Sequence, residues 1–349
     1  MNRIKVGVVG VGYLGQHHAR IYSKLPEVEL VGVVDIDEGK SNAIAAQAGC
    51  QAYQDFHALL DKVQAVSIAV PTLVHHEVAL SFLRAGVDVL LEKPMTVTLD
   101  EADDLMREAE KRGNLLQIGH LERFNSVVRA LDGRIDKPRF IESHRLGPFV
   151  ERGTDVHVVL DLMIHDIDII LSLVNSPVEL IRAVGVSVIS PQIDIANARI
   201  EFSSGCVANV TASRVSREKM RKIRIFQPDA YFSLDYLQQE VTVCRRVAQE
   251  PSASGGERPQ SEALAWPGRP PEAERGVGAS EDLSSDVAAR APTYKLLIER
   301  LEIHKEEPLE AEIAAFIDCV RTRKRPIVSG QEGREALRVA LEILKEIKN

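Results

Sequence analysis

A short apolar strand that runs directly into a glycine-spaced turn, IKVGVVGVGYLG at Ile4 to Gly15, constrains the fold more than any other stretch. The GxGxxG spacing is typical of the turn between a buried parallel strand and a helix in dinucleotide-binding folds. The first glycine allows the sharp turn, the second lets backbone approach a pyrophosphate, and the third lets the helix pack on the strand. We predict that this helix starts near Tyr13 and that its free N–H groups and dipole bind phosphate. The residues expected at the cofactor phosphates are Gly10, Gly12, Tyr13, Leu14 and Gly15.

An acidic residue follows the next strand at the distance that such folds require. The apolar segment Glu29 to Val34 ends at Asp35, roughly twenty residues after the turn. A carboxylate there hydrogen-bonds the adenosine ribose hydroxyls and repels a 2′-phosphate, so NAD is favoured over NADP. Asp37 is a second candidate for this role. A tight turn followed by a solvated acid is the alternative, but it leaves the ordered succession of strand, turn, helix, strand and acid without a reason.

Composition limits the remaining classes of protein. A chain of 349 residues, 45% of them hydrophobic and 27% charged, can bury a full core and is long enough for two domains. The formal net charge of -8 disfavours nucleic-acid binding. No apolar run reaches the ~18 residues that span a bilayer, so no membrane partner is expected. The four cysteines lie far apart without a CxxC pair, which predicts neither a zinc site nor disulfides and fits a cytoplasmic location.

Residues 1–122 are predicted to form a Rossmann domain, a doubly wound parallel sheet, because apolar strands alternate with amphipathic helical segments. The predicted helices are Gly39–Ala48, Phe56–Leu60, Val74–Ala85 and Leu99–Lys111, and the predicted strands are Ala65–Val70, Val87–Leu91 and Leu115–Ile118. Ligands of such sheets bind beyond the carboxyl ends of the strands. Two loops at that position, Pro71-Thr72 and Glu92-Lys93-Pro94, are therefore predicted to meet at the nicotinamide end of the cofactor.

Residues 123–349 are predicted to form an α+β domain with a large, mostly antiparallel sheet that leaves one face open. The predicted strands are Phe140–His144, Leu180–Val188, Ala198–Phe202, Cys206–Ala212, Ile223–Phe226, Tyr231–Leu234 and Val241–Val243. Residues 250–292 are rich in Pro, Gly, Ser and charge and are predicted to be a surface insertion without a direct catalytic role, with Trp266 as a local packing point. Structure resumes at Leu296–Ile303, and the helices Glu310–Arg323 and Glu332–Lys348 can pack back on the first domain.

The predicted helix Val158–Val174 contains the most informative polar residues of this domain. Apolar residues recur in it at helical spacing and it has no lysine or arginine, so most of its surface is expected to be buried. Asp161, His165 and Asp168 stand at i, i+4 and i+7 and share one face. Buried acids and imidazole need partners or a ligand, so this face is either a site or a histidine held by two acids in the core. Asp166 points elsewhere and is expected to be structural.

Lys93 within Glu92-Lys93-Pro94, together with Asp161 and His165 in DxxxH spacing, resembles the pattern of the Gfo/Idh/MocA family of sugar oxidoreductases. Further matching positions are His18, the segment from Pro71-Thr72 to His75, and Arg123-Phe124-Asn125. The chain departs from the family pattern at Thr72, where asparagine is frequent, and at Asp155 to Val159, where a glycine pair is frequent. The resemblance implies a cis Lys93-Pro94 bond and cofactor contacts from Pro71, Thr72, His75, Glu92 and Lys93.

The same resemblance implies that Lys93, Asp161 and His165 act on the substrate hydroxyl or ketone beside the nicotinamide. The residue types suit that chemistry. Imidazole titrates near neutral pH, so His165 can take the hydroxyl proton. Lys93, as a fixed cation, can hold the oxygen and stabilise developing negative charge. Asp161 either orients the imidazole or binds another hydroxyl.

Two stretches point to a nucleotide-sugar substrate. The segment Arg214 to Arg224 carries six basic residues and one acid, and is either a solvated edge or a diphosphate contact. The run from residue 152 to 174 resembles the bacterial branch of the family that oxidises UDP-N-acetylglucosamine at C3, a step that precedes amino-sugar incorporation into lipid A. The residues expected to bind substrate are Arg123, Asn125, Arg152, Asp168 and Arg214, and no metal ligand is expected.

Two other functions stay open at this point. One is an inositol or free-sugar dehydrogenase of the same family. The other is a non-catalytic regulator that binds NAD and a sugar, which the presence of Lys93, Asp161 and His165 disfavours; a basic DNA-reading module is not apparent either. Because relatives pair through the open sheet face, the resemblance also implies a homodimer or homotetramer.

Overall fold

The computed structural model describes residues 3–150, 156–248 and 294–348. The predicted insertion at 250–292, with Trp266, and the candidate substrate residue Arg152 lie outside the described residues. One large compact unit comprises Met1–Cys244 and Ile298–Asn349, and a small unit, Arg245–Leu297, is described only at its two strand ends. Among the described helices, none combines the length and the apolar character needed to cross a membrane.

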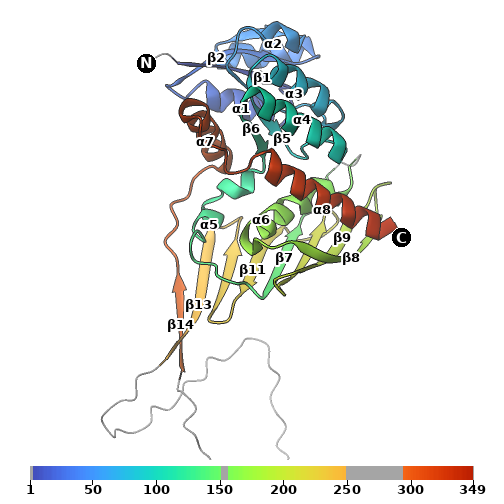
Figure 1. The fold of residues 1–349 in the computed structure, drawn as a ribbon, viewed down its shortest axis with the longest axis vertical. Coiled ribbons are helices and arrows are strands. Elements are labelled where there is room, and N and C mark those ends of the chain that lie inside the picture. The colour runs from blue at the N-terminus through green and yellow to red at the C-terminus, as the bar shows by residue number, and fades with distance from the viewer. Residues whose placement is uncertain (1–2, 151–155, 249–293, 349) are drawn as a thin grey trace, which may run out of the picture. The chain divides into compact units, whose positions relative to one another are not determined.

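Within the described residues, six parallel strands form the first sheet in the order β3-β2-β1-β4-β5-β6 (Figure 1). They are β1 (Ile4–Val9), β2 (Val28–Val34), β3 (Gln51–Tyr53), β4 (Ala65–Ile68), β5 (Asp88–Glu92) and β6 (Leu116–Gly119). The central strands are buried along most of their length, as their apolar runs require. The predicted Rossmann sheet is confirmed. Its strand order reverses between β1 and β4, and ligands of such sheets bind beyond the strand ends at that point.

The helices of this domain agree with the prediction in position and differ at their ends. They are α1 (Gly15–Tyr22), α2 (Glu38–Ala48), α3 (His75–Arg84) and α4 (Leu99–Arg112), with 3-10 turns η1 (Phe56–Leu59) and η2 (Thr72–Val74). The predicted start of α1 near Tyr13 is wrong because residues 10–14 form the turn itself. The boundaries of α4 follow from a capping box of Thr98 with Glu101 and from Gly113 in left-handed conformation.

In the described part of the second domain, eight strands form a sheet in the order β14-β13-β12-β11-β7-β10-β9-β8. They are β7 (Phe140–Leu146), β8 (Val178–Val186), β9 (Ile195–Phe202), β10 (Val207–Ser213), β11 (Met220–Phe226), β12 (Ala230–Asp235), β13 (Glu240–Ala248) and β14 (Tyr294–Arg300). The pairs β8–β9, β9–β10, β7–β11 and β11–β12 are antiparallel, whereas β7 and β10 run parallel. The prediction of a mostly antiparallel sheet is confirmed.

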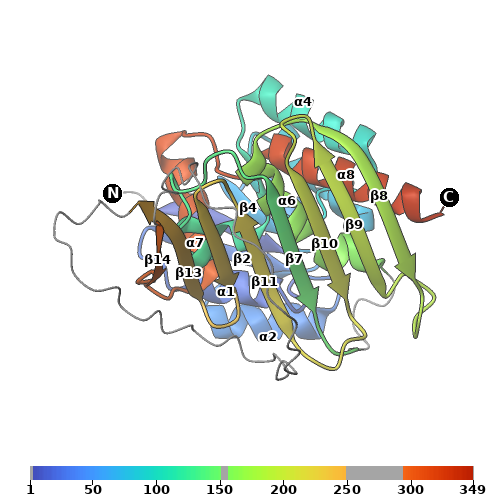
Figure 2. The ribbon, with the colours of Figure 1, turned by 90° about the horizontal axis from the view of Figure 1, so that it is seen from below.

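Helices cover one face of this sheet, as Figure 2 shows for α6 (Ile164–Val174) and α8 (Gly330–Lys348). Side chains alternate accordingly along β9, where Ala198 and Ile200 are buried against the helices and Asn197 and Arg199 are exposed on the other face. The buried face of the sheet and the apolar side of α6 form one core. The second domain is therefore an open-faced sheet with its site helix on the covered side.

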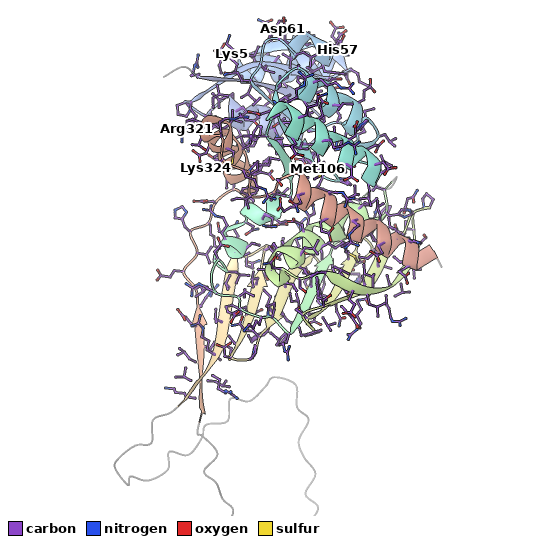
Figure 3. The ribbon with its side chains drawn as sticks, viewed as in Figure 1. Lys5, His57, Asp61, Met106, Arg321 and Lys324 are labelled. Carbon is purple, nitrogen blue, oxygen red and sulfur yellow. The ribbon has the colours of Figure 1, made fainter. Side chains whose placement is uncertain are left out.

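The last two helices join the domains within the large unit. Phe316 of α7 (Pro308–Thr322) lies in one core with Val8 of β1. Leu337 of α8 contributes to the core of the first domain, and Ile343 contributes to that of the second. On the outer side of α7, Arg321 projects from the surface (Figure 3). A single C-terminal segment thus fixes β5 and β6 relative to α6, and these elements hold the residues described next.

Candidate active site

The glycine turn has the shape that a dinucleotide needs. Gly10 follows β1 with a φ of 83°, and a Cβ there would lie 2.6 Å from the carbonyl oxygen of Ala69. A Cβ on Gly15 would overlap the carbonyl oxygen of Gly10, so α1 packs closer to the strand than any side chain allows. Gly12 has no neighbouring atom within 4 Å of such a Cβ. Backbone at Gly12 is therefore open to an approaching pyrophosphate, and the turn fits a dinucleotide cofactor.

The two acids after β2 have different partners. Asp35 accepts the Val11 N–H at 2.9 Å and the Asp37 N–H at 3.0 Å, so its carboxylate lies beside the glycine turn. The Asp37 carboxylate caps α2 by accepting the Lys40 N–H at 3.1 Å, and these bonds lower its pKa. Asp35 is therefore the acid positioned toward the cofactor crevice, whereas Asp37 serves the helix.

The loops after β4 and β5 are tied together by a buried imidazole. His75 is 1% exposed; its Nδ1 lies 3.0 Å from the Pro94 carbonyl oxygen and its Nε2 lies 2.9 Å from that of Val70. Burial lowers the pKa of His75, so the neutral ring donates to one of these oxygens. Pro71 and Thr72 lie in the first of the two loops and are more exposed. The Lys93-Pro94 bond in the second loop is cis, as expected.

Glu92, which precedes Lys93 in the chain, is hydrogen-bonded to His18 and to the Lys93 backbone. Its Oε1 is hydrogen-bonded to Nε2 of His18 at 3.1 Å, and its Oε2 accepts the Lys93 N–H at 3.3 Å. Glu312 of α7 is 0% exposed, and neither of its carboxyl oxygens has a hydrogen-bond partner among the described residues. Burial, and then the charge of Glu92, raise the pKa of Glu312 well above its ordinary value. Glu312 is thus a buried carboxyl that binds its proton more tightly than usual, and Glu92 is held in place by His18.

Lys93 reaches from β5 to the site helix of the second domain. Its Nζ donates to the main-chain oxygen of Asp161 at 2.7 Å and to Asp161 Oδ1 at 3.4 Å. The helix here departs from the prediction of one continuous α-helix, because Val159–Met163 is a π-helical turn, η4, and α6 follows it. Such turns are frequent at functional sites. An ammonium group has three donors, so Lys93 can hold a substrate oxygen as well.

His165 lies one turn further along the helix and is 8% exposed. Its Nδ1 is sealed from solvent without a partner among the described residues, which leaves Nε2 as the nitrogen that can reach a substrate. Burial, and then the positive charges of Lys93 and Arg145, lower the pKa of His165 well below its ordinary value. A neutral imidazole at pH 7 is the form that accepts a proton. The site therefore combines a fixed cation, a carboxylate and a neutral base.

Two further predicted residues are paired with each other. Arg123 Nη1 lies 3.3 Å from Asp168 Oδ1, and Asp168 is 2% exposed. Burial raises the pKa of Asp168 to about 7, although Arg123 opposes that shift. Asn125 is a helix cap, since its Oδ1 accepts the Val127 N–H at 3.2 Å. The substrate contacts of these residues stay predictions.

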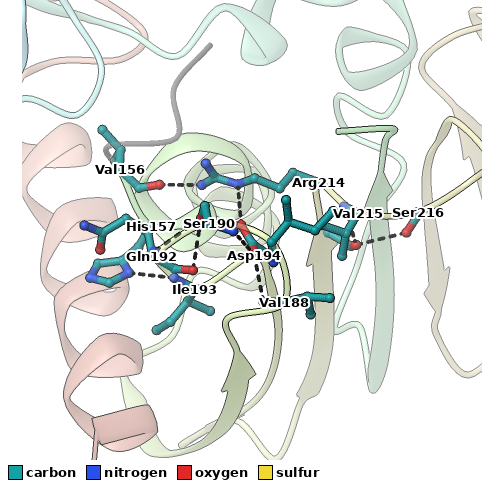
Figure 4. Close-up of polar contacts among 12 residues, drawn as sticks. Val156, His157, Val188, Ser190, Gln192, Ile193, Asp194, Arg214, Val215 and Ser216 are labelled. Atoms are coloured by element: carbon teal, nitrogen blue, oxygen red, sulfur yellow. Dashed lines mark hydrogen bonds and ion pairs between the residues drawn. The ribbon is translucent and has the colours of Figure 1, made fainter. Parts of the chain in front are cut away.

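Arg214 directly follows β10 and contacts the residues that precede the site helix. It is 5% exposed. Figure 4 shows its guanidinium between the carbonyl oxygen of Val156, to which it donates, and the carboxylate of Asp194. Asp194 in turn accepts three successive N–H groups, those of Val188, Ile189 and Ser190. Burial opposes the shift, but these bonds and the Ser190 hydroxyl lower the pKa of Asp194 to about 2. Arg214 therefore supports the segment that leads into η4, and its role as a diphosphate contact stays a prediction.

Sequence reasoning missed three buried residues around this site. His120, directly after β6, is 1% exposed and its ring packs edge to face against His165. Arg145 of β7 pairs with both Asp166 and Glu122. Asp166 is therefore buried against Arg145, on a different face of the helix from Asp161. Only His120 had a usable signal, since it follows an apolar strand at the edge where Glu92 and Lys93 also lie.

Comparison with known proteins identifies the family. The sequence model described as an oxidoreductase family with an NAD-binding Rossmann fold matches residues 4–120, and the GFO/IDH/MocA C-terminal domain matches residues 127–231. The chain is 34% identical to the UDP-N-acetylglucosamine 3-dehydrogenase of Acidithiobacillus ferrooxidans, over 98% of this chain and 97% of that protein. The chain belongs to the Gfo/Idh/MocA oxidoreductase family.

The solved structure of the same relative agrees in fold with this Gfo/Idh/MocA oxidoreductase. The solved structure of the Acidithiobacillus ferrooxidans enzyme, GnnA, has a TM-score of 0.83 at 33% identity, covering 99% of this chain and 98% of that chain. The myo-inositol 2-dehydrogenase of Thermotoga maritima is 23% identical over 99% of this chain and 96% of that protein. Family membership makes the protein an NAD(P)-dependent dehydrogenase that acts on CH–OH groups.

Proposed function

We propose that this dehydrogenase is NAD-dependent and oxidises UDP-N-acetylglucosamine at C3, ahead of amino-sugar incorporation into lipid A. The observation that supports this substrate is the 34% identity to a UDP-N-acetylglucosamine 3-dehydrogenase along nearly the whole of both chains, compared with 23% for the myo-inositol enzyme. The position of the Asp35 carboxylate beside the glycine turn favours NAD, because a 2′-phosphate would meet a negative charge there.

The residues of the site have separate tasks in this reaction. Bound NAD supplies the hydride acceptor. His165 Nε2 takes the hydroxyl proton, which it can do because the ring is neutral. The Lys93 ammonium holds the reacting oxygen and stabilises the negative charge that develops on it, and its bond to the Asp161 carbonyl oxygen fixes its position. Asp161, with a side chain 37% exposed, is free to accept a second substrate hydroxyl.

A comparison of substrates tests the proposal. NADH formation is measured with UDP-N-acetylglucosamine, free N-acetylglucosamine and myo-inositol, each with NAD and with NADP. We expect turnover of the nucleotide sugar with NAD, and a kcat/KM at least about 100-fold lower without the UDP group. The reason is that the binding energy of a non-reacting part of the substrate, here the UDP group, helps to stabilise the transition state. Turnover of myo-inositol alone would assign the protein to the inositol dehydrogenases. No turnover of any of them would favour the binding-only regulator.

We also propose that the open sheet face pairs with a second copy of the chain. Phe226 on this face, 36% exposed, packs with Phe140 and Tyr231 at ring-centroid distances of 5.6 and 4.8 Å. Sedimentation velocity should show a dimer or tetramer for the native chain and a smaller species for Phe226→Glu. The matched control is Ile327→Glu, at another exposed apolar residue. A monomeric native chain would refute this proposal.

A further inference from the structure

His120 is a buried imidazole without hydrogen-bond partners, placed against the proposed base. It follows β6, the neighbour of β5 in the sheet, and is 1% exposed. Neither Nδ1 nor Nε2 of His120 has a partner among the described residues. Buried polar groups without hydrogen bonds are costly, so a ring with two of them is rarely retained for packing alone.

The ring of His120 meets that of His165 at a centroid distance of 6.2 Å and an interplanar angle of 87°. The Nδ1 atom of His165 is likewise buried and unpaired in the described chain. With centroids this far apart, nitrogens of the two rings can approach to about 4–5 Å, a gap that one water bridges with two hydrogen bonds of about 2.8 Å. One such bridge pairs Nδ1 of His165 with one nitrogen of His120, and the other nitrogen of His120 keeps no partner among the described residues.

We propose that His120 is a positioning residue for the reaction, which accepts the Nδ1–H of His165 through one bridging water and so keeps the lone pair of His165 at Nε2. The proposal rests on the proposed function, in which Nε2 is the base. A neutral imidazole carries its proton on only one nitrogen, and without an acceptor at Nδ1 the two tautomers compete. Only the tautomer with the proton on Nδ1 can accept a proton from the substrate.

Burial and nearby positive charges keep His120 neutral, so His120 itself takes no part in the proton transfer. Burial, and then the positive charges of Lys93 and Arg123, lower the pKa of His120 to about 3. His120 therefore stays neutral while His165 gains and loses its proton. The charged groups that act on His165 from the elements packed around it are Lys93, Arg145 and Arg221. The acids on the same helical segment are Asp161 in η4 and Asp166 and Asp168 in α6.

His120→Phe tests the proposal because it keeps a flat ring of similar size and removes both nitrogens. In the NAD-bound enzyme we expect kcat to fall by about 10–100-fold with NAD affinity unchanged, the size of loss that follows when the outer hydrogen-bond partner of a metal-bound imidazole is removed. An acceptor at Nδ1 stabilises the imidazolium, so its loss lowers the pKa of His165 and the acid limb of kcat moves to lower pH. His120→Gln, which retains an acceptor, should recover part of both effects. A native kcat and an unmoved acid limb in His120→Phe would overturn the proposal.

A spectroscopic measurement separates this proposal from the identity of the substrate. In protein labelled with ¹⁵N at histidine, the ring shifts of His165 report its tautomer with NAD bound and without turnover. We expect the Nδ1–H tautomer in the native protein and a mixture in His120→Phe. The result can hold even where UDP-N-acetylglucosamine proves not to be the substrate. The same tautomer in both proteins would refute the role of His120.

Discussion

Substitution of Lys93 by methionine is expected to abolish turnover while NAD binds with nearly unchanged affinity. The methionine side chain has similar length but cannot hold the reacting oxygen or offset its charge, a loss worth at least about 100-fold in kcat. His165→Asn removes the proton acceptor and is expected to lower kcat by about 100–10,000-fold. NAD affinity, measured by titration calorimetry, should stay within a few-fold of the native value in both variants.

Matched substitutions at exposed positions control for these changes. Lys24→Met and His57→Asn make the same chemical replacements at residues on the surface, away from the strand ends of the cofactor crevice. Both control variants should retain native kcat. Full activity in Lys93→Met and His165→Asn would contradict the assignment of the site, and a parallel loss of NAD binding would show that these side chains act on the cofactor instead.

The first domain could be predicted because its information is local. Apolar runs, glycine spacing and the acid at Asp35 each depend on a few consecutive residues, and each strand of the sheet repeats the same pattern. The short edge strand β3 was missed because three half-exposed residues, Gln51 to Tyr53, carry no period. The helix start near Tyr13 was wrong for a related reason, since sequence spacing does not separate the turn from the first helical residue.

The site helix was predicted in place and only partly in geometry. The spacing of Asp161 and His165 correctly predicted that they share one face, but the π-helical turn Val159–Met163 depends on contacts from elsewhere in the chain. Lys93, 68 residues away, donates to the Asp161 carbonyl oxygen within that turn. Partners at such separations are set by the assembled fold, which no local pattern records.

Buried charges were the largest omission, because their pairing is set entirely by tertiary structure. Glu122 and Arg145 read as ordinary surface residues of a polar loop and an alternating strand, yet they are 5% and 3% exposed. The carboxylate of Asp166 completes their cluster from the far side of the site helix. The sequence indicated only that Asp166 points away from Asp161, and not that it pairs with Arg145.

Removal of Arg145 is expected to cause the largest loss of stability of any single change near the site. Its Nε and Nη2 donate to the Asp166 carboxylate at 2.7 and 3.1 Å, and its Nη1 donates to Glu122 Oε1 at 2.8 Å. Arg145→Met leaves two buried carboxylates without their common partner, which costs about 3–5 kcal/mol in the free energy of unfolding. Urea unfolding of native and variant protein at neutral pH measures the difference.

Two further variants show whether the loss of stability in Arg145→Met comes from the unpaired carboxylates of Glu122 and Asp166. Arg199→Met removes an exposed arginine paired with Glu201 on the open face and should cost no more than about 1 kcal/mol. Adding Glu122→Gln and Asp166→Asn to Arg145→Met removes both carboxylates and should restore much of the stability, since a cluster with no charge needs no counter-ion. Native stability in Arg145→Met would contradict the role of the cluster.

The pH dependence of this loss should reveal its electrostatic origin. Burial raises the pKa of Glu122, but the charge and hydrogen bond of Arg145 outweigh that effect and hold the pKa below its ordinary value. A lowered pKa contributes stability above the ordinary pKa of the group, and this stability is lost as the pH falls through the folded value. Without Arg145 only Arg221 and Asn125 oppose the effect of burial, so the carboxyl binds a proton at higher pH, and the cost of its charge disappears once it is protonated. The difference between native protein and Arg145→Met should therefore be greatest at neutral pH and shrink on acidification, whereas a loss caused only by side-chain packing would be the same at every pH.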